Sequence, residues 1–165
     1  MTPSQGHFQK EHFFTIASEE ELIQSFRPRD QKKLILPGRL PFPIKIQSYL
    51  AWQEPSGVYT YLIFKMPNWD LPRGVTFKRT HGGGELAGGL CGWCHSYGTS
   101  EEIAFLSVMM DPNVSQSYLL CQDLRCIEKI EETAMRGGKD PDKYIAELYY
   151  RMEKLFENLS GYKSE

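Results

Sequence analysis

Alternation of apolar and polar residues predicts an antiparallel sheet across the middle of the chain. Five stretches alternate in this way or are rich in β-branched and aromatic residues, which is typical of strands: residues 44–52, 58–64, 75–79, 103–110 and 117–120. Proline and glycine in residues 53–57, and the sequence Asp111-Pro112-Asn113, favour turns. The first two and the last two stretches are therefore predicted to form two hairpins.

Apolar residues at helical spacing dominate the end of the chain. They run from Tyr144 to Leu159, after Asp140-Pro141, which favours a helix start, and before Gly161, which favours its end. This pattern predicts a long amphipathic C-terminal helix. Its apolar side is expected to pack on the sheet or, alternatively, to contact a partner.

Two shorter helices are predicted from their end signals. Residues 18–21 read Ser-Glu-Glu-Glu, a capping box that predicts a helix over about residues 19–26. Asp123 can cap a helix over about residues 124–136, which Gly137-Gly138 would end. Together with the strands, these helices predict an α+β fold with a short N-terminal helix.

Length and composition favour one folded unit. The 165 residues are 41% hydrophobic and 24% charged, which is typical of an ordered domain rather than of a disordered chain. We expect residues 1–17 to be an N-terminal tail and residues 18–165 to be a single domain. No apolar run approaches the roughly 18 residues of a membrane helix, and no signal-peptide layout is present. We therefore expect a cytoplasmic protein without a membrane partner.

Charge is unevenly distributed along the chain. The net charge is −2, but residues 1–99 carry 11 Lys and Arg against 8 Asp and Glu, and the remainder carries 8 against 13. A basic stretch near the N-terminus, opposed locally only by Asp30, could meet RNA phosphates or an acidic partner: Arg27, Arg29, Lys32, Lys33 and Arg39. The alternative is an ordinary solvated basic loop.

Two pairs of cysteines carry the most specific chemistry. Cys91 and Cys94 are separated by two residues, and Cys121 and Cys126 by four, with a predicted hairpin between the pairs. Zinc binds four thiolates tetrahedrally, and short spacings let both sulfurs of a turn face one ion. Cys126 falls in the first turn of a predicted helix, where free N–H groups stabilise a thiolate. This order of knuckle, hairpin, strand end and helix start is the treble-clef layout, with Arg125 and Lys129 placed to offset its negative charge.

Other uses of the cysteines are less compatible with the sequence. Cys91-Gly-Trp-Cys94-His95 also matches a c-type haem attachment motif, and a lone Cys-x-x-Cys can be a thioredoxin-like redox pair, but neither the export signal nor the βαβ context is present. Four buried unliganded thiols remain an alternative, as does His95 replacing one thiolate.

Enzymatic chemistry is not indicated. Four thiolates close the coordination shell, and no metal-activating His-x-Glu or His-Glu-x-x-His motif accompanies them. The glycine-rich residues 82–89 predict a loop without the ending of a phosphate-binding P-loop. We therefore expect a structural zinc ion, one per chain, in a protein that is not an enzyme.

The cysteine segments resemble a known family. Residues 90–96 (LCGWCHS) and 117–126 (SYLLCQDLRC) are similar to the C-terminal treble-clef zinc finger of the elongation-factor-G-binding proteins, which include the staphylococcal fusidic-acid-resistance proteins. A weaker similarity extends upstream through residues 25–37 and 74–79. The resemblance implies a zinc-stabilised α+β domain, zinc ligation by the four cysteines, and binding of elongation factor G, with the ribosome as a further partner.

The sequence also suggests where a partner could bind. Trp93, between two zinc ligands, would be an anchor if it faced outward and a packing residue if it faced inward. The candidate partner surface comprises six residues: Trp93, Arg27, Arg29, Lys32, Lys33 and Arg79. The alternative function is binding of RNA, including ribosomal RNA, by the same basic residues together with Arg39 and Lys78. DNA is not an expected partner.

Overall fold

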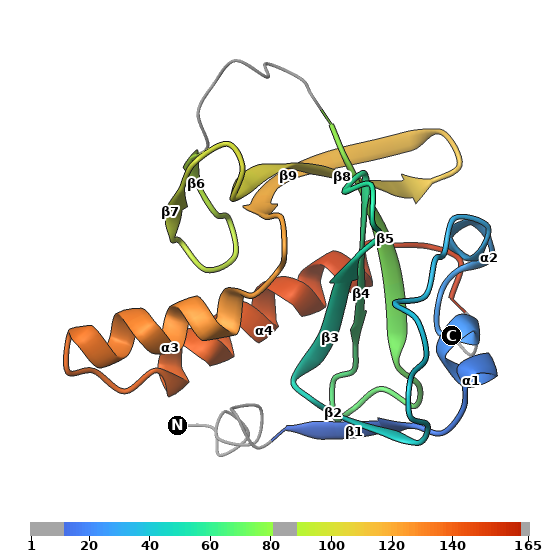
Figure 1. Ribbon diagram of the computed structural model, residues 1–165, viewed down its shortest axis with the longest axis horizontal. Helices are drawn as coiled ribbons and strands as arrows, with labels where there is room; N and C mark the ends of the chain where they lie inside the picture. Colours follow the sequence, from blue (N-terminus) through green and yellow to red (C-terminus); the bar gives the residue numbers. More distant parts are fainter. Residues whose placement is uncertain (1–11, 81–88, 163–165) are drawn as a thin grey trace.

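The computed structural model of the protein describes residues 12–80 and 89–162 (Figure 1). The glycine-rich loop predicted at residues 82–89 lies, except for Gly89, outside the described residues. The described strands are β1 (Phe13–Ile16), β2 (Ile44–Gln47), β3 (Tyr49–Gln53), β4 (Tyr59–Phe64), β5 (Arg73–Arg79), β6 (Gly89–Leu90), β7 (Tyr97–Gly98), β8 (Ile103–Asp111) and β9 (Val114–Cys121). The helices are α1 (Glu19–Gln24), α2 (Pro28–Gln31), α3 (Cys126–Arg136) and α4 (Asp142–Glu157).

A five-stranded antiparallel sheet organises the fold, in the order β3-β4-β5-β8-β9. The two predicted hairpins are its outer pairs, β3–β4 and β8–β9, and β5 joins them. Both faces of β4 are covered, because Leu62 and Phe64 belong to one apolar core while Tyr61 and Ile63 belong to another. The mixed helix and antiparallel-sheet class predicted from the sequence is therefore confirmed.

The stretch predicted as one strand over residues 44–52 is two strands in different sheets. Ser48 separates them with a φ of 70°, a left-handed conformation that interrupts strand geometry. β3 belongs to the main sheet, whereas β2 lies outside it and pairs with β1. The expected tail, residues 1–17, therefore includes a strand, which forms because Phe14 and Ile16 alternate with exposed neighbours and reach the core.

The helices α3 and α4 lie side by side and extend from the side of the sheet that β3 borders (Figure 1). The apolar side of α4 joins the core formed by the sheet and the zinc-finger segment. The two aspartates predicted to cap the starts of α3 and α4 do not occupy the N-cap positions. Asp123 accepts a hydrogen bond from the Arg125 N–H and caps no helix, and Asp140 accepts one from the Asp142 N–H while Pro141 takes the N-cap position.

The N-terminal helices cover the other face of the sheet. Ser18 accepts a hydrogen bond from the Glu21 N–H, as the capping box predicts, and the Glu21 carboxylate accepts one from the Ala17 N–H. Phe26, just after α1, bridges to Gly74 of β5. A Cβ atom on Gly74 would lie 2.8 Å from the Phe26 ring, which is closer than side chains tolerate. Glycine at this position therefore lets the helical segment contact the sheet.

We expect Gly74→Ala to lower the free energy of unfolding by about 1–3 kcal/mol, because the added methyl group overpacks a buried contact. Gly137→Ala is the matched control, since its Cβ would meet its nearest neighbour at an ordinary 3.7 Å. Urea unfolding of both variants measures the difference. Equal stability of the two variants would contradict the close contact between Phe26 and Gly74.

Candidate metal centre

The first half of the site is a tight turn between two short strands. β6 and β7 pair with each other, and the turn between them contains Cys91 and Cys94. Backbone hydrogen bonds close this turn, from the Cys91 N–H to the Ser96 carbonyl (2.9 Å) and from the His95 N–H to the Cys91 carbonyl (2.9 Å). The Gly92 N–H donates to the Leu119 carbonyl of β9 at 2.7 Å, which fixes the turn against the hairpin that leads to the other cysteines.

The second half is a strand end followed by a helix start. Cys121 is the last residue of β9 and Cys126 the first residue of α3. Leu124 lies between them with a φ of 55° and a side chain that is 1% exposed. The left-handed conformation is uncommon for leucine, and packing of its buried side chain holds it there. The chain consequently turns back so that both sulfurs face the first pair.

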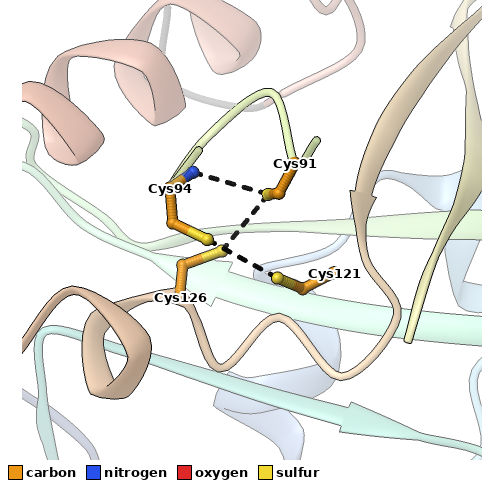
Figure 2. A group of neighbouring side chains, drawn as sticks. All are labelled: Cys91, Cys94, Cys121 and Cys126. Carbon is orange, nitrogen blue, oxygen red and sulfur yellow. Dashed lines mark hydrogen bonds between the residues drawn. The ribbon is translucent and has the colours of Figure 1, made fainter. Parts of the chain in front are cut away.

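The four sulfur atoms form one compact cluster (Figure 2). All lie within 4.8 Å of one another, with 3.9 Å between the Sγ atoms of Cys91 and Cys126 and 3.6 Å between those of Cys94 and Cys121. Four ligands at a Zn–S distance of about 2.3 Å in a tetrahedron stand about 3.8 Å apart. The 3.9 and 3.6 Å separations match this geometry, and both are far longer than a disulfide bond. Residues from both halves thus fit a single zinc ion.

Local electrostatics favour thiolates at Cys91 and Cys94, whereas interactions with these two cysteines raise the pKa of Cys121 and of Cys126. The backbone N–H groups of Trp93 and Cys94 point at the Cys91 sulfur at 3.3 and 3.4 Å. Hydrogen bonds from the Cys121 and Cys126 thiols hold the pKa of Cys91 well below its ordinary value and lower the pKa of Cys94 to about 7. Thiolate is the form that binds zinc.

The two cations near the cysteines have different roles. Burial disfavours the charged form of Lys129, but hydrogen bonds and attraction to Cys121 and Asp123 outweigh this effect and raise the Lys129 pKa. Arg125 instead pairs with the Glu128 carboxylate, and both side chains are largely exposed. Lys129, rather than Arg125, therefore offsets the negative charge of the cluster.

A tyrosine from the sheet fixes the helix start that carries Cys126. The Tyr49 hydroxyl donates a hydrogen bond to the Leu124 carbonyl and accepts one from the Cys126 N–H at 3.1 Å. Burial raises the pKa of Tyr49 well above its ordinary value, so the hydroxyl stays protonated. Tyr49 lies 75 residues from Leu124 in sequence, and the strand pattern that contains it gives no sign of this contact.

These features define a treble-clef zinc finger with a closed shell of four cysteine thiolates. A family model described as FBP C-terminal treble-clef zinc-finger matches residues 20–165, and the chain belongs to this family. The expected structural zinc ion is thereby confirmed. A comparison with curated proteins finds no match. Within the described part of the chain, no helix has the length and hydropathy that crossing a membrane requires.

Two predicted partner residues are buried. Trp93 is 5% exposed and packs edge-on against Phe77, so the inward alternative is correct. Arg27 is 1% exposed. Its buried guanidinium is stabilised by hydrogen bonds, from Nε to the Asp30 carboxylate at 2.9 Å and from Nη1 to the Ser160 carbonyl. The outward alternative for Trp93 and the expected place of Arg27 on an exposed basic surface are therefore wrong. Both side chains stabilise the fold instead.

The remaining basic candidates are only partly available to a partner. Lys32 and Lys33 are exposed, whereas Arg29 and Arg79 are half-buried. The prominent aromatic residue near the cysteines is Tyr97 on β7, which is 85% exposed. Sequence reasoning missed it because β7 is only two residues long and shows no alternation. His95 is exposed and lies outside the sulfur cluster.

The purified protein is expected to contain one zinc ion and no haem, and Cys126→Ser to lose the zinc. Loss of a ligand removes metal-binding free energy of order 10 kcal/mol from folding, so the melting temperature should fall by at least about 10 °C. Elemental analysis and thermal unfolding measure both effects. Ser115→Ala, at an exposed position of β9, is the control. A full zinc equivalent with unchanged melting in Cys126→Ser would refute the ligand assignment.

Replacing Tyr49 by phenylalanine tests the connection between the sheet and the zinc finger. We expect Tyr49→Phe to destabilise the protein by about 1–3 kcal/mol, because a buried N–H and a carbonyl lose their partner. Tyr97→Phe, which removes a hydroxyl from an exposed ring, should leave stability unchanged. Denaturant unfolding of the zinc-loaded proteins provides the comparison. If both variants match the wild type, the Tyr49 hydroxyl does not support the site.

Proposed function

We propose that this protein is a non-enzymatic binding protein of the cytoplasmic translation apparatus whose zinc finger binds elongation factor G. The partner is suggested by the resemblance of the cysteine segments to proteins that bind this factor. The closed thiolate shell supports a structural rather than a catalytic zinc, because a catalytic zinc keeps an open position for water or substrate.

The observation that carries the proposal is an exposed groove beside the cysteine turn. Its volume is about 880 Å³, and it lies between the segment from Trp93 to Tyr97 and the helices α3 and α4. Tyr97, 85% exposed, lines this groove, and Met135, 79% exposed, adjoins it in the sequence of α3. Exposed tyrosine and methionine side chains are typical anchors of protein interfaces.

The zinc finger gives this groove a rigid wall. The Arg151 side chain of α4 donates a hydrogen bond to the Trp93 carbonyl at 2.8 Å, which ties the cysteine turn to the helices. The buried Trp93 ring packs against Phe77 and so fixes the cysteine turn to the core. A pre-organised surface loses little conformational entropy on binding, so Tyr97 is well placed to contribute binding free energy.

We expect Tyr97→Ala to weaken binding to purified elongation factor G at least about tenfold, or roughly 1.4 kcal/mol. Tyr150→Ala is the control, since Tyr150 is also exposed, at 59%, but belongs to a different surface. Calorimetric titration of zinc-loaded, normally melting variants measures both affinities. Undiminished binding by Tyr97→Ala would show that this groove is not the interface. No binding by the wild type would show that elongation factor G is not the partner.

Binding of RNA is the competing outcome. If ribosomal RNA were the partner, reversing Lys32 and Lys33 to glutamate would weaken binding and flatten its dependence on salt. Binding to elongation factor G through the groove should instead be insensitive to this double substitution. Titrations at two salt concentrations separate the two functions.

A further inference from the structure

One edge of the main sheet is open. β3 pairs with β4 on one side, and among residues 12–80 and 89–162 no strand pairs with its other side. The Glu54 N–H donates to the opposite Tyr59 carbonyl, which places Glu54 and Tyr59 in a hydrogen-bonded pair. Because such pairs alternate along an antiparallel ladder, the backbone groups of Tyr49, Ala51 and Gln53 face away from β4.

This open edge lacks the features that usually protect edge strands. Exposed edges are commonly blocked by charged residues, prolines or bulges. The segment from Gln47 to Gln53 contains no proline and no charged residue. Residues 49–52 are half-buried and Gln53 is exposed, so a partner can reach the backbone of this edge. An unprotected edge of this kind is suited to pairing with another strand.

A groove runs along the edge. Its volume is about 540 Å³, and it is lined by residues 47–53 on one side and by the segment around the start of α3 on the other. It shares no lining residue with the groove beside Tyr97. A strand edge facing a helix across a groove is the arrangement by which extended peptides bind through added strand pairing.

The groove has an acidic wall, which identifies the kind of partner. Its lining includes the carboxylates of Asp123, Glu128 and Glu131 and a single cation, Arg125. Lys129 binds Asp123 and Arg125 binds Glu128, so the carboxylate of Glu131 carries the excess negative charge. A segment with lysine or arginine would complement this wall, whereas an acidic segment would be repelled.

We propose that the groove between β3 and α3 binds an extended, basic segment of another protein, which adds to the sheet as a strand beside β3. Its backbone pairs with the outward groups of Tyr49, Ala51 and Gln53, and its basic side chains face the carboxylate of Glu131. This interaction is separate from binding of elongation factor G. A second copy of the chain fits less well, because a symmetric pairing would bring like-charged walls together.

The test uses the zinc-loaded full chain and an eight-residue peptide of alternating valine and lysine with blocked ends. We expect saturable binding with a dissociation constant of about 1 mM or tighter, and amide shifts at Tyr49, Ala51 and Gln53 in NMR spectra. A peptide with alternate backbone nitrogens methylated should not bind, since it cannot complete the ladder. Absence of binding by the first peptide, or equal binding by the methylated one, would overturn the proposal.

Two variants of the protein test the same site. Ala51→Pro removes an outward N–H without breaking a bond to β4, a position where edge strands accept proline, and should weaken peptide binding at least about fivefold if melting is normal. Glu131→Lys should weaken it similarly, and Glu132→Lys, on the other groove, is the charge-matched control. Equal effects of the two lysine variants, or full affinity for a valine–glutamate peptide, would refute the role of the acidic wall.

Other occupants would give distinct results. Sedimentation analysis that shows a dimer broken by Ala51→Pro would assign the edge to a second copy. Peptide binding that occurs only after removal of residues 1–11 would assign the groove to the chain's own N-terminal segment. Either result would overturn the proposal of a basic partner.

Discussion

The structure depends on one zinc ion held by four thiolates. The ion connects segments that are distant in sequence, since Cys91 and Cys126 are 35 residues apart and Cys94 and Cys121 are 27 apart. Closing loops of this length costs conformational entropy, which the metal–sulfur bonds offset. The turn that carries Cys91 contains little regular structure of its own, so the metal fixes its position against the hairpin and α3.

The zinc finger is also integrated with the sheet. Tyr49 of β3 contacts the start of α3 directly, and Trp93 packs against Phe77 of β5. The side chain of Arg151 joins α4 to the cysteine turn. These contacts make the sheet, the helices and the metal site parts of one core, so two grooves on opposite sides of α3 are presented by a single rigid support.

Sequence patterns predicted the local features well and the long-range ones poorly. Spacing alone indicated the grouping of the cysteines, because each pair lies within a turn or a strand-to-helix junction whose geometry is local. The two hairpins were also predictable, since alternation and turn residues are local signals. By contrast, Arg27 looked like part of a basic surface beside Asp30, and only the fold buries this pair and places the Ser160 carbonyl against Arg27. The role of Tyr49 likewise arises from a contact across 75 residues, and Tyr97 lies in a strand too short to have a pattern.

The metal centre requires that four cysteine thiolates and no other ligands surround the zinc. X-ray absorption spectroscopy at the zinc edge, on protein purified without chelator, tests it most directly. We expect a single shell of four sulfur atoms at about 2.3 Å. A mixed shell, in which nitrogen from His95 or oxygen from water replaces a sulfur, would show that the four cysteines are not the complete set of ligands.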